Sequence, residues 1–108
     1  MGALEVVETI MKNRKPYEKV VYLLKTYKDL KLGKEINDSN RNVIELIDKV
    51  LELIKDDKDI DIIKRLYVDG YTYDETAEII GMDKRTLYRQ RRRLIKRIAI
   101  IIYGDRAL

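Results

Sequence analysis

The chain has 108 residues, of which 45% are hydrophobic and 39% are charged. This composition is too apolar for a disordered chain and too rich in charge for a membrane protein. Cysteine and histidine are both absent, which excludes disulfides, a thiolate nucleophile and the most common zinc ligands. The length allows one domain with a modest core. The composition points away from an enzyme, and we expect no cofactor.

The first half of the chain predicts three helices. A short one covers residues 3–13. Pro16 begins a second helix over 16–31, because the N–H that proline lacks would have no partner at that position, and we expect it to end at Gly33. The third helix covers 39–55. Its apolar face is wide enough for two neighbours and consists of Val43, Ile44, Leu46, Ile47, Val50, Leu51, Leu53 and Ile54.

A charged connection over residues 55–61 separates this half from the next. We place the main boundary there, with an N-terminal helical region for packing or oligomerisation over 1–57 and a second region over 58–108. Asp56, Asp57, Asp59 and Asp61 cluster in this connection. Their spacing lacks the glycine and the closing glutamate of a calcium loop. We therefore interpret them as a charged loop and a helix cap, with no metal.

The second half also predicts three helices. The first covers 60–69, directs Ile63, Leu66 and Tyr67 inward and ends before Gly70. A short helix over 74–80 and a long one over 83–103 follow. Sustained strand alternation is absent from the sequence. We predict an all-α fold in which N-terminal helices precede a C-terminal helix-turn-helix with a long basic recognition helix.

The helix-turn-helix prediction depends on the residues around the last turn. Asp74 is a candidate cap for the short helix, and Ala77 is small where two helices must approach closely. Gly81 supplies the tight turn with a positive φ, and Asp83 caps the long helix. Inward positions of the long helix are occupied by Leu87, Leu94, Ile98 and Ile101 or Ile102. These roles, at these spacings, match a support helix, a turn and a recognition helix.

The charge is concentrated at the same end of the chain. The net charge is +4. Residues 81–108 carry nine basic and two acidic side chains, a net +7, whereas residues 1–80 carry 14 basic and 17 acidic ones, a net −3. Eight Lys or Arg and no acid lie between residues 84 and 97. Such a block repels itself until a polyanion neutralises it, so we expect double-stranded DNA as the partner.

Residues 59–103 resemble the region-4 helix-turn-helix of sigma factors, and more closely the phage transcriptional regulators of the ArpU and RinA type. The similarity is carried by Arg65-Leu66-Tyr67, by the run Lys84-Arg85-Thr86-Leu87-Tyr88-Arg89 and by the basic stretch and apolar tail that follow. Leu87 stands where the ArpU-like family often has Tyr. Gln90 stands where sigma factors usually have an apolar residue, which favours the phage regulators.

Each residue of the expected DNA surface has a functional role and an alternative. Lys84, Arg85 and Arg89 would reach base edges or only phosphates. Thr86 would bond a phosphate or its own helix N-terminus. Tyr88 would contact DNA or pack on the support helix. The basic residues from Arg91 to Arg97 cannot all face DNA, so some must face solvent, an acidic neighbour or a partner chain. We assign DNA binding to Lys84, Arg85, Thr86, Tyr88, Arg89, Arg92, Arg93 and Lys96.

The apolar faces of 43–54 and of the long helix are wider than a three-helix domain normally buries. Either the N-terminal helices cover them or two chains pair, and we expect a homodimer. The first ten residues include Glu5 and Glu8, which a signal peptide would not tolerate. The longest uncharged apolar run, residues 98–103, is far shorter than the ~20 residues of a membrane span. We expect a cytoplasmic protein that does not enter membranes.

These inferences predict a sequence-specific double-stranded DNA-binding transcriptional regulator, encoded by a phage or prophage, as the resemblance implies. Two alternatives remain open. A small terminase-like DNA-packaging subunit also joins a helix-turn-helix to an oligomerising helical region. A sigma-like module would bind RNA polymerase and have little affinity for free DNA.

Overall fold

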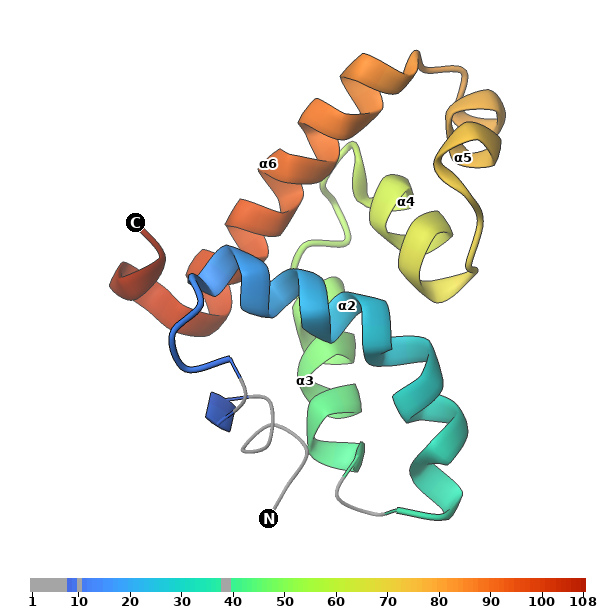
Figure 1. The fold of residues 1–108 in the computed structure, drawn as a ribbon. Coiled ribbons are helices and arrows are strands. Elements are labelled where there is room, and N and C mark those ends of the chain that lie inside the picture. Colours follow the sequence, from blue (N-terminus) through green and yellow to red (C-terminus); the bar gives the residue numbers. More distant parts are fainter. Residues whose placement is uncertain (1–7, 10, 38–39) are drawn as a thin grey trace.

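The computed structural model describes residues 8–9, 11–37 and 40–108. All secondary structure in these ranges is helical (Figure 1), which confirms the predicted all-α class. Within the described ranges, no helix is long and apolar enough to cross a membrane. The elements in chain order are α2 (Pro16–Leu32), a 3₁₀ turn (Gly33–Glu35), α3 (Asn40–Leu53), α4 (Ile60–Ile63), a π-helical segment (Lys64–Val68), α5 (Tyr73–Ile80), α6 (Lys84–Tyr103) and a C-terminal 3₁₀ turn (Gly104–Ala107).

The short helix expected over 3–13 does not continue over residues 11–13. Residues 1–7 and 10 lie outside the described part, residues 8–9 are helical, and residues 11–13 form a turn. The Arg14 N–H closes this turn by donating to the carbonyl of Met11 at 2.8 Å. Lys15 then takes an extended conformation with ψ 152°. A residue before proline is disfavoured in the helical region, so Pro16 separates the two segments.

Helix α2 begins at Pro16, as predicted, and ends at Leu32, directly before Gly33. Its inward stripe consists of Val20, Leu23, Leu24 and Tyr27, all buried. Helix α3 buries Val43, Ile44, Ile47, Val50 and Leu51, and Ile54 just beyond it is also buried. The inclusion of Leu53 in that face was wrong, because its side chain is 58% exposed. The buried positions share one side of the helix, and Leu53, although three residues after Val50, lies at the edge of that side.

The main core joins both halves of the chain. It contains side chains of α2 and α3 together with Ile63, Tyr67, Leu94, Ile98 and Tyr103. Figure 1 shows α2 crossing α6 on one side and lying beside α3 on the other. The sequence boundary at 57/58 therefore lies between segments that share one core. The N-terminal helices cover most of the apolar side of α6, which is one of the two options that the sequence left open.

The expected helix over 60–69 is present but changes its winding. Four residues of α4 precede a π-helical segment, in which the Asp69 N–H donates to the carbonyl of Lys64 at 2.9 Å. Ile63 and Tyr67 are buried as predicted, and Leu66 is partly buried. Gly70 follows with φ +80°. Ile62 is also buried, in a second and smaller cluster with Ala77 and Leu87. Residues 60–68 thus contact two cores.

Candidate nucleic-acid interface

Two helices and the turn between them form one end of the molecule. Helix α5 ends at Ile80 and is followed by Gly81, which has φ +76° and whose N–H donates to the carbonyl of Ala77 at 2.9 Å. Asp83 then caps α6, its carboxylate accepting from the Thr86 N–H at 2.8 Å. These hydrogen bonds hold the pKa of Asp83 below its usual value. The predicted turn glycine and the predicted cap of the long helix are therefore confirmed.

The predicted cap of the short helix was wrong. Thr72, not Asp74, is the N-cap of α5. The Thr72 hydroxyl accepts from the Glu75 N–H at 3.1 Å, and the Glu75 carboxylate accepts from the Thr72 N–H at 3.1 Å. This reciprocal pair is a capping box. It satisfies two backbone donors, whereas Asp74 would satisfy one, so the helix begins one residue earlier than expected.

The smaller core holds α5 against the first turns of α6. Ala77 and Leu87 face each other in it, with 7% and 0% of their surfaces exposed. Tyr73, Ile80 and Met82 pack around them. Burying Leu87 turns the opposite side of α6 toward solvent. The orientation of the basic face follows from this contact.

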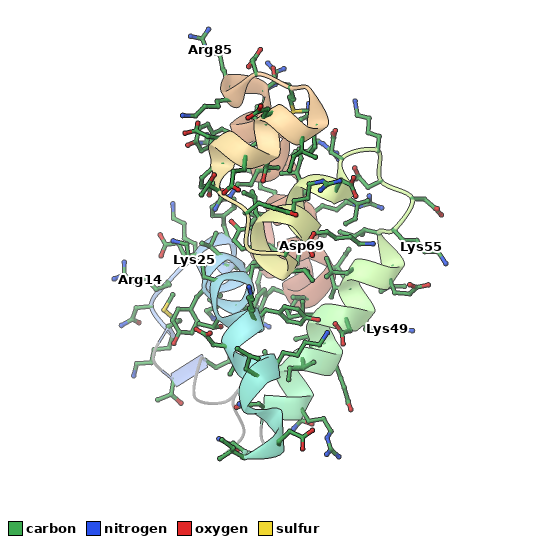
Figure 2. All side chains as sticks on the ribbon, turned by 90° about the vertical axis from the view of Figure 1, so that its right-hand side faces the viewer. Arg14, Lys25, Lys49, Lys55, Asp69 and Arg85 are labelled. Atoms are coloured by element: carbon green, nitrogen blue, oxygen red, sulfur yellow. The ribbon has the colours of Figure 1, made fainter. Side chains whose placement is uncertain are left out.

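That outward side carries a row of four unpaired cations. Arg85, Arg89, Arg92 and Lys96 follow one another at spacings of four, three and four residues, which places them on one side of a helix. All four are exposed, and none makes an ion pair within the part of the chain that the structure describes. Figure 2 shows Arg85 projecting from the end of the molecule opposite the α2–α3 turn. We call these four residues the basic row.

Three other predicted site residues are already engaged within the chain. Lys84 forms an ion pair with Asp74 of α5, with Nζ and Oδ1 2.8 Å apart. The Thr86 hydroxyl donates to Asp83 at 3.3 Å. The ring of Tyr88 is 44% exposed and packs on Tyr73, with 4.8 Å between the ring centroids. For Thr86 and Tyr88 these are the local contacts that the sequence left open as alternatives.

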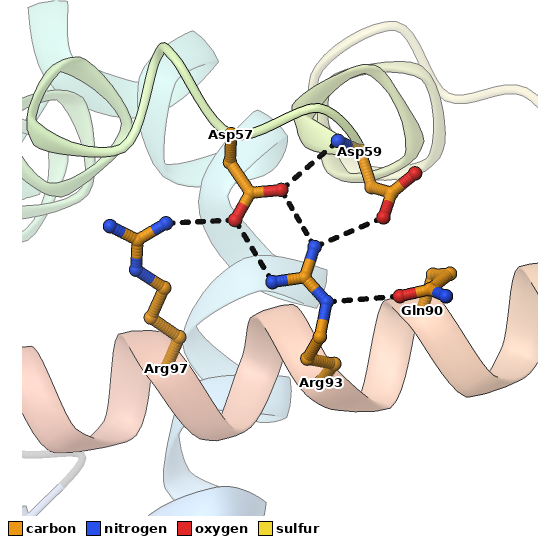
Figure 3. Close-up of polar contacts among 5 residues, drawn as sticks. All are labelled: Asp57, Asp59, Gln90, Arg93 and Arg97. Atoms are coloured by element: carbon orange, nitrogen blue, oxygen red, sulfur yellow. Dashed lines mark hydrogen bonds and ion pairs between the residues drawn. The ribbon is translucent and has the colours of Figure 1, made fainter.

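Arg93 lies off the basic row and faces the acidic connection between α3 and α4 (Figure 3). Its guanidinium donates to both carboxylate oxygens of Asp57, at 2.7 and 3.0 Å, and to Asp59 at 3.0 Å. Its Nε donates to Gln90 at 2.9 Å. Arg97 adds a bond to Asp57 at 2.8 Å. The structure thus places Arg93 in an internal ion-pair network rather than among the free cations.

Asp57 is the centre of this network. Its side chain is only 4% exposed, so its charge is stable there only with partners. The hydrogen bonds from Arg93 hold the pKa of the Asp57 carboxyl well below its usual range, and they raise the pKa of Arg93. The network ties the connection between α3 and α4 to the middle of α6.

Arg91 occupies the side of α6 that faces the π-helical segment. Its Nε donates to the Tyr67 hydroxyl at 2.7 Å, and its guanidinium lies 5.7 Å from the centre of the Tyr73 ring. Burial raises the pKa of Tyr67 to about 12. Arg91 therefore acts as a link between the two cores, which sequence reasoning did not identify.

The described residues contain no group of three or more acidic side chains placed to hold a metal ion. A scan against protein-family models and searches of curated proteins and of solved structures gave no match.

Proposed function

We propose that this protein is a sequence-specific double-stranded DNA-binding regulator whose α5 and α6 act as a helix-turn-helix, with α6 as the recognition helix. The resemblance of residues 59–103 to phage regulators of the ArpU and RinA type supports a phage or prophage role in transcription. Under this proposal the protein is a binding protein and not an enzyme.

The single observation that supports this proposal most is the basic row. Surface cations that serve only solubility usually alternate with acids and form pairs at spacings of three or four residues. The cations of the basic row do not alternate with acids, and they form no such pairs with the residues that the structure describes. On the same helix, Arg93, Arg97 and Lys84 all have acidic partners. Four cations on one side of a helix that begins after a tight turn match the way recognition helices enter the major groove.

The geometry suggests different roles along the row. Arg85 and Arg89 lie in the first two turns of α6, which in a helix-turn-helix reach base edges, and arginine pairs bidentately with guanine. Arg92 and Lys96 lie further along and would contact phosphates. The start of α6 also carries Lys84, Thr86 and Tyr88. To contact the DNA backbone, these side chains would have to give up their present contacts within the chain or make additional ones. Arg93 would remain bound to Asp57 and Asp59.

Selection from a pool of random duplexes, followed by fluorescence anisotropy at two salt concentrations, tests the proposal. We expect enrichment of one motif and binding that persists at the higher salt. Arg89→Ala should weaken binding and relax the preference for the motif, whereas Lys96→Ala should weaken all sequences about equally. Lys49→Ala, which removes an exposed charge on α3, is the control and should change neither. A failure to enrich any motif would overturn the proposal.

The oligomeric state is part of the same test. A homodimer would present two recognition helices to successive major grooves. Sedimentation at tens of micromolar, with and without the selected duplex, distinguishes the alternatives. Two chains on one duplex agree with a dimeric regulator, whereas a ring of eight or more chains would favour a terminase-like packaging subunit. Weak duplex binding together with retention of RNA polymerase in a pull-down would favour the sigma-like module.

A further inference from the structure

A groove of about 820 Å³ opens on the same side of α6 as the basic row, nearer to its C-terminal end. Its walls come from the start of α2, the second half of α6 and the C-terminal turn, which converge in Figure 1. Four of its described lining residues are cations, Lys15, Arg92, Lys96 and Arg106, and one, Glu18, is an acid. The Oε2 atom of Glu18 lies 3.8 Å from Nη1 of Arg14. We call this feature the basic groove.

The basic groove also has an apolar lining. It includes Pro16, Ala99, Ile100 and Ala107. Ile100 is 45% exposed although it belongs to a well-packed helix. Apolar surface of this kind gains free energy only when an apolar group covers it. A ligand for the groove must therefore supply both negative charge and a hydrophobic side chain.

The position of the groove argues against DNA as its occupant. Ile100 lies about 22 Å further along the axis of α6 than Arg85, at the usual rise per residue. In a helix-turn-helix the first turns of the recognition helix contact the bases, so a helix that places Arg85 at the bases carries Ile100 away from them. Phosphates would satisfy the cations but would leave the apolar lining uncovered.

We propose that the basic groove binds an acidic peptide segment of a partner protein, one that carries several Asp or Glu residues and a large apolar side chain. The carboxylates would pair with Lys15 and Arg106, and the apolar side chain would cover Ile100. Arg92 and Lys96 belong to both the basic row and the basic groove, so the peptide and a DNA phosphate would compete for them. The peptide site itself does not depend on DNA binding.

Selection of a displayed library of random 12-residue peptides on the immobilised full-length chain tests the inference without any DNA. The double variant Lys15→Glu/Arg106→Glu serves for counter-selection. Both positions are exposed, and a negative charge before α2 is favourable at a helix N-terminus. Arg106 also lies over the Tyr103 ring, 5.8 Å from its centroid, so circular dichroism and thermal unfolding first establish that this variant is folded. Lys15→Glu alone leaves that contact in place and serves as the second variant. We expect enriched peptides to combine acidic residues with at least one large apolar residue.

The affinity of a labelled enriched peptide then locates the site. We expect Lys15→Glu/Arg106→Glu to weaken it at least tenfold and Ile100→Ser to weaken it at least threefold. The charge-matched control Lys25→Glu/Lys49→Glu, at exposed positions on α2 and α3, should change it less than twofold. The inference is overturned by no enrichment, by enriched peptides that lack acids or apolar residues, or by equal weakening in the control. None of these outcomes would contradict DNA binding, which the duplex selection tests separately.

Discussion

Arg93 and Asp57, which are 36 positions apart in the sequence, form a two-pronged ion pair across the connection between α3 and α4. The guanidinium is 42% exposed, whereas the carboxylate is almost completely buried. Because of this difference in exposure, the Asp57 carboxylate depends on the ion pair more than Arg93 does. Arg93 could be hydrated if it were released, but Asp57 would lose most of its stabilisation.

Substitution of Asp57 should therefore destabilise the fold. Asp57→Asn keeps the size of the side chain but removes the charge that Arg93 and Arg97 bind. We expect the free energy of unfolding to fall by about 1–2 kcal/mol, a value that discounts charged hydrogen bonds for the exposure of the arginines. Urea denaturation measures this change. Asp56→Asn, at the exposed neighbouring position, is the matched control, and a similar loss there would show that the network contributes little.

The same pair predicts a dependence of stability on pH. The pKa of Asp57 is lower in the folded protein than its unfolded value of about 3.9. The folded state therefore binds this proton less readily, and the stabilisation is fully present above the unfolded pKa and is lost as the pH falls below it. We expect the stability of the wild type to decline between about pH 5 and pH 2, and Asp57→Asn to decline less. If the stability of the wild type and of Asp57→Asn fell equally as the pH was lowered, Asp57 would not be the source of this pH dependence.

The capping box makes a separate prediction about α5. Thr72→Ala removes the hydroxyl that accepts from the Glu75 N–H and should cost about 1 kcal/mol of folding free energy. Asp74→Ala removes only an exposed ion pair with Lys84 and should cost less. Thermal unfolding of both variants compares the two positions directly. A larger loss for Asp74→Ala would restore that residue as the cap.

The salt dependence of duplex binding tests the number of phosphate contacts. The two phosphate contacts proposed for Arg92 and Lys96 give a slope of about −1.8 in a plot of log K against log salt, and a slope near −3.6 would mean that Arg85 and Arg89 also neutralise phosphates. Removing one phosphate contact, as in Arg92→Ala, should reduce the steepness by about 0.9. Arg97→Ala deletes the same side chain five positions later, where it faces Asp57, and should leave the slope unchanged once the folded fraction is matched.

Local signals in the sequence predicted the turn between α5 and α6 well. Gly81 and Asp83 have roles that depend on their own backbone conformation and on the next three residues, so the turn and the start of α6 could be predicted without knowledge of the rest. The buried position of Leu87 followed from helical periodicity. The capping box is equally local, since Thr72 and Glu75 show the required spacing, but the neighbouring Asp74 is also a favourable capping residue and led to the wrong prediction.

Local signals could not predict which cations of α6 face solvent and which form ion pairs within the chain. Arg92 and Arg93 are adjacent and chemically identical, yet Arg93 is bound to Asp57 and Arg92 has no ion pair with any residue that the structure describes. The difference depends on where the connection after α3 passes α6, which only the packing of distant helices decides. The winding change after Ile63 likewise has no signature in the sequence.

The two cores differ greatly in size, and this has a kinetic consequence. The cluster of Ile62, Ala77 and Leu87 is small, whereas the main core unites α2, α3, α4 and α6. Amide groups of α5 should therefore exchange with deuterium through openings that leave α2 and α3 protected. The end that carries Arg85 would then behave as a separate cooperative unit, which can loosen and close again on its target while the remainder of the protein stays folded.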